Sequence, residues 1–163
     1  RIATLRLRKE QSRQAPATLL QASASGYYGL WQNSAPPCDE GAPSGTGFLA
    51  ETCRLWEQST VPVEAMGIRR CVLRFAPVLG KKADGTPGGF LERMLPPFRM
   101  FMGGPLGSGK QPFCWTHLED VTGAAALLLQ RPDLAGTFNI CAPRTPSMSE
   151  FTRTLGKVYG RPS

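Results

Sequence analysis

A glycine-rich stretch offers the first candidate chemistry, the binding of a phosphate group. Residues 104–111 read Gly-Pro-Leu-Gly-Ser-Gly-Lys-Gln, close to the P-loop pattern GxxxxGK[ST]. The pattern fails at Gln111, because an amide offers no hydroxyl to a magnesium ion. Pro112 has no backbone N–H and a strand-like segment follows, so no helix N-terminus faces a phosphate. Lys110 and Gln111 stay candidates for contact with an anionic substrate such as a diphosphate, and exposure to plain solvent suits them equally.

Two further segments place polar residues at the ends of predicted strands. Residues 21–29 read Gln-Ala-Ser-Ala-Ser-Gly-Tyr-Tyr-Gly, and residues 73–80 read Leu-Arg-Phe-Ala-Pro-Val-Leu-Gly. Ligands of open α/β sheets bind outside the carboxyl ends of the strands, so both segments are candidate site segments. Arg74 ends a buried strand and is expected to pair with an acidic residue that the sequence does not identify.

Composition limits the classes of protein to consider. The chain has 163 residues, 41% of them hydrophobic, and a net charge of +7. This length and hydrophobic content are enough for one ordinary core. Basic residues are scattered apart from a cluster near the start, and basic charge alone is non-specific, so we expect neither nucleic acid nor a membrane as partner. The five cysteines form no CxxC pair and there is one histidine, which predicts reduced thiols, no metal and a cytoplasmic protein. The missing initiator Met predicts a fragment or a processed product.

The elements that must position these residues alternate between strands and helices. Strands are expected at 18–23, 70–75, 113–117 and 137–141, and a long loop at 26–47. Helices are expected at 1–14, 48–66, 88–102, 119–130, and from a cap at Ser147 or Ser149 to Tyr159. Pro62 should kink or split the second helix, and Pro96-Pro97 should interrupt the third. Strands that alternate with helices predict an α/β fold with a parallel sheet.

The order of these segments resembles a known family over almost the whole chain. The most specific segments are GYYG at 26–29, FLAETCRLWE at 48–57, LPPF at 95–98 and GGPLGSGKQ at 103–111. Together they resemble the nucleoside-diphosphate-sugar epimerases, atypical members of the NAD(P)-dependent epimerase/dehydratase branch of the short-chain dehydrogenase/reductases. The resemblance implies a Rossmann-like, doubly wound parallel sheet with a small substrate-side region. Residues 1–85 would form the later half of the NAD(P)-binding core, and residues 86–163 the substrate-side region.

The resemblance also implies roles for individual residues. The cofactor would be NADP or NAD, and Ala22 and Ser23 would face its nicotinamide, with Ser23 bonded to the reacting oxygen. The turn at Phe75, Ala76, Pro77 and Val78 would pack beside the same ring, so Ser23 and Pro77 should emerge side by side. The stretch from Gly107 to His117 would line the substrate pocket, with Lys110, Gln111, Trp115 and His117 as its candidate contacts. The substrate would be a small molecule, such as a sugar nucleotide, and the resemblance leaves a homodimer open.

Two departures from the family pattern limit this interpretation. The usual general base is a Tyr in a YxxxK helix, but here Phe48 or Leu49 stands in place of Tyr, and Thr52 or Cys53 in place of Lys. Neither Phe nor Leu can transfer a proton. The glycine-rich GxxGxxG turn that binds the cofactor pyrophosphate is also absent, so the chain alone is expected to bind the cofactor poorly.

Two alternatives therefore stay open for the site and for the function. Tyr27 or Tyr28 could supply the proton, with Ser23 orienting the substrate, or both rings could pack under the long loop. Likewise, the serines at 23 and 25 could be ordinary turn caps, and His117 could cap the helix that begins near Glu119. The expected function is an NAD(P)-dependent epimerase or oxidoreductase that transfers a hydride at a secondary alcohol or ketone. The alternative is a non-catalytic NADP(H)-binding sensor or scaffold.

Overall fold

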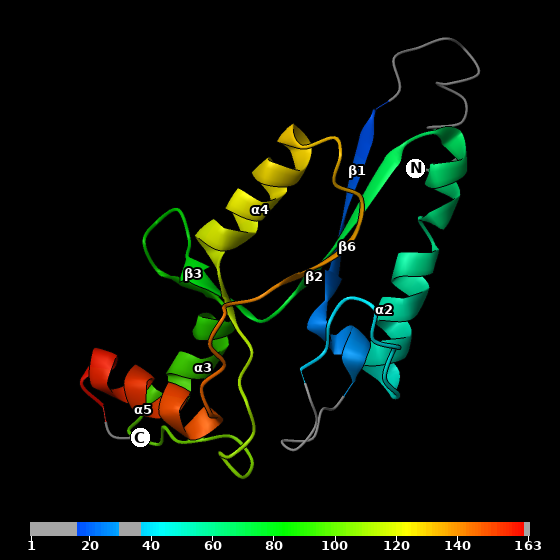
Figure 1. Ribbon diagram of the computed structural model, residues 1–163. Coiled ribbons are helices and arrows are strands. Elements are labelled where there is room, and N and C mark those ends of the chain that lie inside the picture. Colours follow the sequence, from blue (N-terminus) through cyan, green and yellow to red (C-terminus); the bar gives the residue numbers. More distant parts are fainter. Residues whose placement is uncertain (1–15, 30–36, 162–163) are drawn as a thin grey trace. The chain divides into compact units, whose positions relative to one another are not determined.

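The computed structural model describes residues 16–29 and 37–161, which form two compact units (Figure 1). The first unit contains described residues 16–29, 38–75 and 122–140, and the second contains residues 37, 76–121 and 141–161. The two units alternate along the chain, because residues 122–140 return to the first. The helix predicted at 1–14 lies outside the described residues.

A parallel sheet forms the centre of the first unit. It contains β1 (Thr18–Ala24), β2 (Arg69–Phe75) and β6 (Gly136–Ile140) in the order β1-β2-β6. The register places Ser23 beside Arg74 and Ala24 beside Phe75. These strands confirm three of the four predicted ones, with ends that differ by one residue at most.

Helices cover both faces of this sheet, as the doubly wound pattern requires. Because side chains alternate along a strand, Cys71 and Leu73 of β2 point to one face. There they pack against Leu128 of α4 (Leu118–Gln130), whose residues from 122 on belong to this unit. Val72 and Arg74 point to the other face, the side of α2 (Phe48–Gln58). The Rossmann-like α/β fold expected from the sequence is confirmed.

Pro62 divides the long helix expected at 48–66. Helix α2 ends at Gln58, and a short 3-10 helix, η2 (Val61–Met66), follows with Pro62 in its first turn. A proline is tolerated there because that N–H has no intrahelical partner in any case. Gly67 then ends η2 with a φ of 70°, as a left-handed C-cap. In the region predicted as a long loop, residues Ser25–Tyr28 form a further 3-10 helix, η1.

The second unit contains a small sheet that the sequence did not predict. Its strands are β3 (Val78–Lys81), β4 (Pro87–Gly89) and β5 (Thr116–His117), in the order β4-β3-β5. Strand β3 pairs antiparallel with β4 and parallel with β5. Of the strand expected at 113–117, only the two residues of β5 pair with β3. The backbone N–H of Phe113 bonds to Pro146 O and not to a strand of this sheet.

Two helices pack together in the second unit. Helix α3 (Phe90–Arg99) and α5 (Met148–Tyr159) share a core of Met94, Leu95, Phe98 and Leu155. The expected interruption of α3 at Pro96-Pro97 is wrong, since the helix continues through both. Pro96 and Pro97 have no N–H groups, so the carbonyls of Glu92 and Arg93, one turn earlier, lack a helical partner. Both residues are exposed, and water can solvate these carbonyls.

The predicted cap of the last helix is confirmed at Ser147. The Ser147 side chain accepts from the Glu150 N–H, and the Glu150 carboxylate accepts from the Ser147 N–H, which forms a capping box. None of the helices in the described part of the chain combines the length and apolar character that a membrane span needs.

Candidate functional site

A buried ion pair lies under the predicted nicotinamide-side segment of the first unit. Arg74 donates from Nε to Glu57 Oε1 and from Nη2 to Glu57 Oε2, both at 2.9 Å. The side chains are 4% and 11% exposed. Ser23 Oγ donates to the same Glu57 Oε1 at 2.6 Å. Glu57 is therefore the acidic partner expected for Arg74, and it also binds the candidate catalytic serine.

The two tyrosines complete this cluster in different ways. Tyr28 accepts a hydrogen bond from Arg74 Nη1 at 2.9 Å and donates its hydroxyl proton to Asn139 Oδ1 at 2.7 Å. The Tyr27 ring instead lies against the Arg74 guanidinium, with 3.4 Å between Arg74 Cζ and the ring centroid. Such a cation–π contact stabilises a partly desolvated charge. Among the described residues, the Tyr27 hydroxyl has no hydrogen-bond partner, so it is the phenol free to meet a ligand.

Burial and pairing act in opposite directions on the two charges. Burial raises the pKa of Glu57, but hydrogen bonds from Arg74 and Ser23 and the Arg74 charge outweigh it, so the pKa lies below the usual carboxyl value. Burial likewise lowers the pKa of Arg74, but Glu57 and Tyr28 hold it above its ordinary value. Both groups therefore stay charged near neutral pH, and we call Ser23, Tyr27, Tyr28, Glu57 and Arg74 the Glu57–Arg74 cluster.

The candidate cofactor residues lie in both units. In the first unit, Ala22 is exposed and points to the face opposite Ser23, while Phe75 is half-buried at the end of β2. In the second unit, Ala76 is buried, Pro77 and Val78 are half-buried, and Pro77 O accepts from the Thr116 N–H at 3.1 Å. That Ser23 and Pro77 emerge side by side stays a prediction.

The glycine-rich stretch packs against the start of α5. Gly109 O accepts from the Ser149 N–H and Gln111 O from the Met148 N–H, each at 2.9 Å. Gly109 has a φ of 71°, and a Cβ there would lie 2.2 Å from Ser149 Oγ. These contacts explain by packing why a glycine stands at this position.

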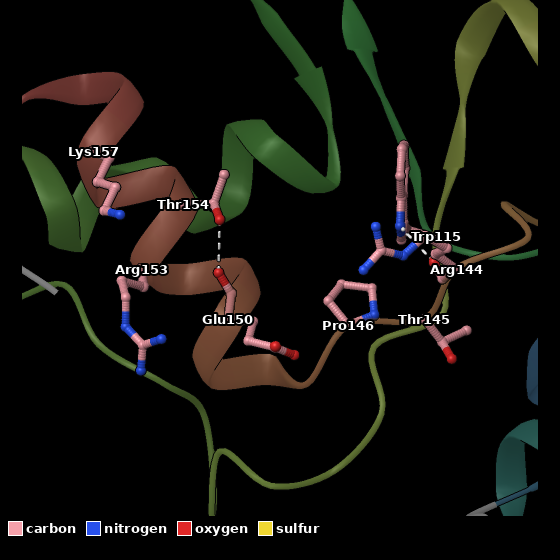
Figure 2. A pocket seen from close by; sticks show the side chains of 8 residues that line it. All are labelled: Trp115, Arg144, Thr145, Pro146, Glu150, Arg153, Thr154 and Lys157. Atoms are coloured by element: carbon pink, nitrogen blue, oxygen red, sulfur yellow. Dashed lines mark hydrogen bonds between the residues drawn. The ribbon is translucent and has the colours of Figure 1, made fainter.

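The candidate substrate residues of the second unit have different surroundings. The Gln111 side chain bonds to Leu106 O and Ser108 Oγ within its own loop, and Lys110 is exposed. His117 Nδ1 accepts from the Glu119 N–H at 3.3 Å, the capping geometry that was the alternative for this residue. Trp115 Nε1 donates to Arg144 O at 3.2 Å, and the indole lines a cavity beside α5 (Figure 2).

Sequence reasoning missed Glu57 and the basic residues of this cavity as site residues. Glu57 belongs to the quoted segment at 48–57, and its spacing of four and seven residues from Cys53 and Ala50, both buried, places it on the inner face of α2. A carboxylate at a buried helical position was therefore the available signal. For Arg144, Arg153 and Lys157 the signal was weaker, because only the last two share a helix.

Comparisons with known proteins agree with the resemblance. No family model matches the chain. An epimerase family protein SDR39U1 homolog, chloroplastic, from Arabidopsis thaliana is 40% identical over 148 residues, which are 91% of this chain and 40% of that protein. Epimerase family protein YfhF of Bacillus subtilis is 34% identical over 94% of this chain and 48% of its own length. Over most of its own length, the chain is similar to part of these epimerase family proteins. It spans about half or less of the length of the relatives that it matches.

Solved structures of the epimerase family have the same fold. The crystal structure of human epimerase family protein SDR39U1 (isoform 2) with NADPH matches 98% of this chain and 52% of its own, with a TM-score of 0.77 and 29% identity. The nucleoside-diphosphate sugar epimerase from Corynebacterium glutamicum matches 95% of this chain and 32% of its own, with a TM-score of 0.77 and 30% identity.

Helix α2 begins with two residues, Phe48 and Leu49, whose side chains cannot carry out acid–base chemistry. Phe48 and Leu49 are 83% and 65% exposed, and Cys53, four residues after Leu49, is buried at 5%. Thr52 donates its hydroxyl proton to Phe48 O at 2.7 Å. No phenol and ammonium pair is therefore present on this helix. Near the strand ends, Tyr27 is the phenol whose hydroxyl has no hydrogen-bond partner among the described residues.

The cysteines are free, as predicted, and two of them interact. Cys53 and Cys71 are buried, Cys38 and Cys114 half-buried, and Cys141 exposed. The described residues contain no cluster of three His, Cys, Asp or Glu that could hold a metal ion. Burial raises the pKa of Cys114 to about 11, and the neighbouring Cys141 thiol adds to the shift.

This pKa predicts slow alkylation of Cys114 in the folded protein. At about pH 8, roughly one Cys114 thiol in a thousand is ionised, against about one in four for a free cysteine with a pKa of about 8.5. Iodoacetamide should therefore modify Cys114 about 100-fold more slowly than it modifies a cysteine peptide, as read by mass spectrometry of tryptic peptides. Denaturant should abolish the difference, and equal rates in the folded protein would contradict the assigned surroundings.

Proposed function

We propose that the chain supplies the nicotinamide-side and substrate-side parts of an NADP(H)-dependent epimerase or oxidoreductase. The observation that carries the proposal is the match over 98% of the chain to an epimerase family structure solved with NADPH. Residues 1–85 then belong to the cofactor-binding part and residues 86–163 to the substrate-side part, except for residues 122–140, which return to the sheet of the first unit. We also propose a small-molecule substrate of the sugar-nucleotide class and a cytoplasmic location. A homodimer stays a prediction, for which exposed Leu55 and Trp56 on α2 offer an apolar surface.

The residues at the strand ends fit a flat aromatic ring. Ala22 is exposed and carries only a methyl group, so a planar ring can approach the backbone at the end of β1. Phe75 ends the neighbouring strand, opposite Ala24. The bound nicotinamide would exchange a hydride with a secondary alcohol or ketone of the substrate. We assign Ala22, Ser23 and Phe75, and the turn at 76–78 that follows them in the chain, to its contacts.

We propose Tyr27 as the residue that moves the proton. Its hydroxyl is free among the described residues, whereas the Tyr28 hydroxyl is shared between Arg74 and Asn139. The Arg74 guanidinium lies against the Tyr27 ring and holds this ring beside the end of β1. Ser23 would orient the substrate oxygen, for which its hydroxyl has to turn away from Glu57.

A non-catalytic NADP(H)-binding role is the second candidate, and two observations favour it. The Ser23 hydroxyl already donates to a buried carboxylate, and α2 offers Phe48 and Leu49 where a proton donor would stand. Neither observation affects cofactor binding, so the two candidates differ in chemistry alone. Substitution of the two tyrosines separates them.

Tyr27→Phe should lower kcat of the full-length protein by about 100-fold or more, in the range of a lost general acid. The substitution keeps the ring under Arg74, so the melting temperature should not change. Activity is measured by screening sugar nucleotides with NADP+ at the nicotinamide absorbance band and by product analysis, because a pure epimerase regenerates its cofactor. Tyr159→Phe, on the far end of α5, is the matched control.

Tyr28→Phe has a different expected effect. It leaves Arg74 Nη1 without its phenolic acceptor and should lower the free energy of unfolding by about 1–3 kcal/mol. Unchanged turnover in Tyr27→Phe would remove the proposed proton donor, and unchanged turnover in both variants would leave neither phenol a catalytic role. NADPH binding without turnover of any sugar nucleotide would favour the non-catalytic candidate.

A further inference from the structure

Two cysteines of the second unit are neighbours, although they are far apart in the sequence. Cys114 is half-buried, Cys141 is exposed, and both thiols are free. The Cys141 thiol is close enough to Cys114 that its charge and its hydrogen bond add to the rise in the pKa of Cys114. Neighbouring thiols are the first requirement for a disulfide bond, whose geometry is narrow.

Backbone hydrogen bonds hold the two segments that carry these cysteines together. The Phe113 N–H donates to Pro146 O, and the Ala142 N–H donates to Trp115 O, both at 2.7 Å. The segments run antiparallel. Facing residues of antiparallel chains have Cα atoms about 4.5–5.5 Å apart, within the span that a disulfide bridges. The backbone therefore already holds the two segments at the spacing that a disulfide needs.

The different surroundings of the two thiols set the order of their reactions. Cys141 is exposed to dissolved reagents. Burial, followed by the neighbouring Cys141, raises the pKa of Cys114 to about 11, so few of the Cys114 thiols are ionised at neutral pH. Cys141 is therefore the residue that a dissolved oxidant meets first.

The first reaction of Cys141 favours the second reaction, that of Cys114. A Cys141 sulfur that is bound in a mixed disulfide carries no charge, so it no longer raises the pKa of Cys114. The attack of Cys114 on this sulfur is also intramolecular, and the high effective concentration of a neighbouring group offsets a small ionised fraction.

We propose that Cys114 and Cys141 form a reversible, redox-sensitive disulfide. The oxidant is a small-molecule disulfide, for which oxidised glutathione is the probe. The Cys141 thiolate attacks one sulfur of the probe, and one reduced glutathione leaves as its thiolate and takes up a proton. The Cys114 thiolate then attacks the Cys141 sulfur, forms the bond between the two cysteines and releases the second glutathione. Two electrons and two protons pass to the probe, so one disulfide is reduced as the other forms.

The bond closes a loop that contains α4 and β6. Both elements lie between the two cysteines in the sequence. A cross-link across such a loop restricts the unfolded chain and thereby stabilises the folded one. The oxidised protein should melt at least about 5 °C above the reduced protein. Neither a cofactor nor a substrate takes part, so the disulfide is independent of the proposed function.

Peptide mapping of the full-length protein tests the proposal. The folded protein is incubated with equal concentrations of reduced and oxidised glutathione, alkylated with iodoacetamide in denaturant and digested with trypsin. Trypsin does not cut between Arg131 and Pro132, so residues 111–144 stay one peptide that contains both cysteines. In at least about half of the molecules this peptide should carry no alkyl group and should be lighter than the reduced peptide by two hydrogen atoms. Dithiothreitol should restore both alkylation sites.

Three variants assign the two steps to the two residues. Cys114→Ser should stop after the first step, with one glutathione on Cys141. Cys141→Ser should stay almost free of glutathione, because Cys114 reacts about 100-fold more slowly than an ordinary cysteine. The matched control Cys38→Ser removes a half-buried thiol of the first unit and should form the disulfide in the same yield as the unchanged protein. Circular dichroism melts of the reduced variants establish that each is folded.

Several results would overturn the proposal. These are a glutathione adduct on Cys141 of the unchanged protein without the loss of two hydrogen atoms, and equal glutathione yields in Cys114→Ser and Cys141→Ser. A dimer on a non-reducing gel in place of the bond within one chain would also overturn it. A disulfide that forms but does not raise the melting temperature would contradict the spacing assigned to the two segments.

Discussion

Glu57→Ala should lower the free energy of unfolding by about 3–5 kcal/mol, because it leaves the Arg74 guanidinium buried without its counter-charge. The same substitution removes the acceptor of Ser23 Oγ. Urea unfolding followed by circular dichroism measures the change. If Glu57→Ala does not fold, Glu57→Gln keeps one acceptor and gives a smaller loss that can be measured.

The matched control is Glu64→Ala, which removes another carboxylate paired with an arginine of β2. Glu64 lies 3.2 Å from Arg70 Nη1, but its side chain is 53% exposed, so the expected loss is below about 1 kcal/mol. A Glu57→Ala protein as stable as Glu64→Ala would show that the Glu57–Arg74 cluster does not stabilise the fold.

The lowered pKa of Glu57 also sets the direction of a pH effect. A carboxyl group with a lowered pKa in the folded state stabilises the protein above its unfolded pKa of about 4.3. That contribution is lost as the pH falls below this value toward the folded pKa. Glu57→Gln should therefore show a smaller loss of stability on acidification than the unchanged protein.

Gly45→Ala should lower the free energy of unfolding by about 3 kcal/mol, at the upper end of the range for overpacking. An added Cβ would lie 2.2 Å from the Tyr28 carbonyl oxygen and 2.7 Å from the Gly29 nitrogen. All of its close neighbours are backbone atoms, so no side chain can rotate away. The Gly45 N–H also bonds to Tyr27 O at 2.9 Å, so the residue holds the turn that carries both tyrosines.

Gly41→Ala provides the comparison within the same segment. A Cβ at Gly41 would be 3.4 Å from Asp39 Oδ1, an ordinary contact, and the expected change is within about 0.5 kcal/mol. Thermal unfolding of both variants measures the two losses of stability. If Gly45→Ala melts at the temperature of Gly41→Ala, the close approach of residue 45 to the tyrosine turn is wrong.

Local signals explain which elements could be predicted from the sequence. Buried strands β1 and β2 stand out as short apolar runs, and the cap at Ser147 is marked by Glu150 three residues later. Strands β3 and β4 lack such a signal, because Val78–Lys81 and Pro87–Gly89 are short and contain glycine. Their pairing depends on contacts between distant residues, which no local pattern shows.

The candidate site was predictable only in its strand-end residues. The position of Ser23 at the end of a strand follows from the pattern, but its contact with Glu57 depends on how α2 packs on the sheet. Two tyrosines adjacent in sequence likewise gave no reason to choose between them. Tertiary contacts separate them, since Arg74 bonds to one hydroxyl and lies against the other ring.

The proposed cofactor site is tested most directly by the affinity of the full-length protein for NADPH. This affinity is measured by fluorescence titration for two variants, one with a substitution in β1 and one with a substitution just before it. Ala22→Phe adds a ring at the exposed position proposed to face the nicotinamide, and Ala17→Phe adds the same ring at an exposed position just before the strand. Binding should weaken by at least about tenfold in Ala22→Phe and stay unchanged in Ala17→Phe. Equal affinity in both variants, or no saturable NADPH binding by the unchanged protein, would contradict the proposed cofactor site.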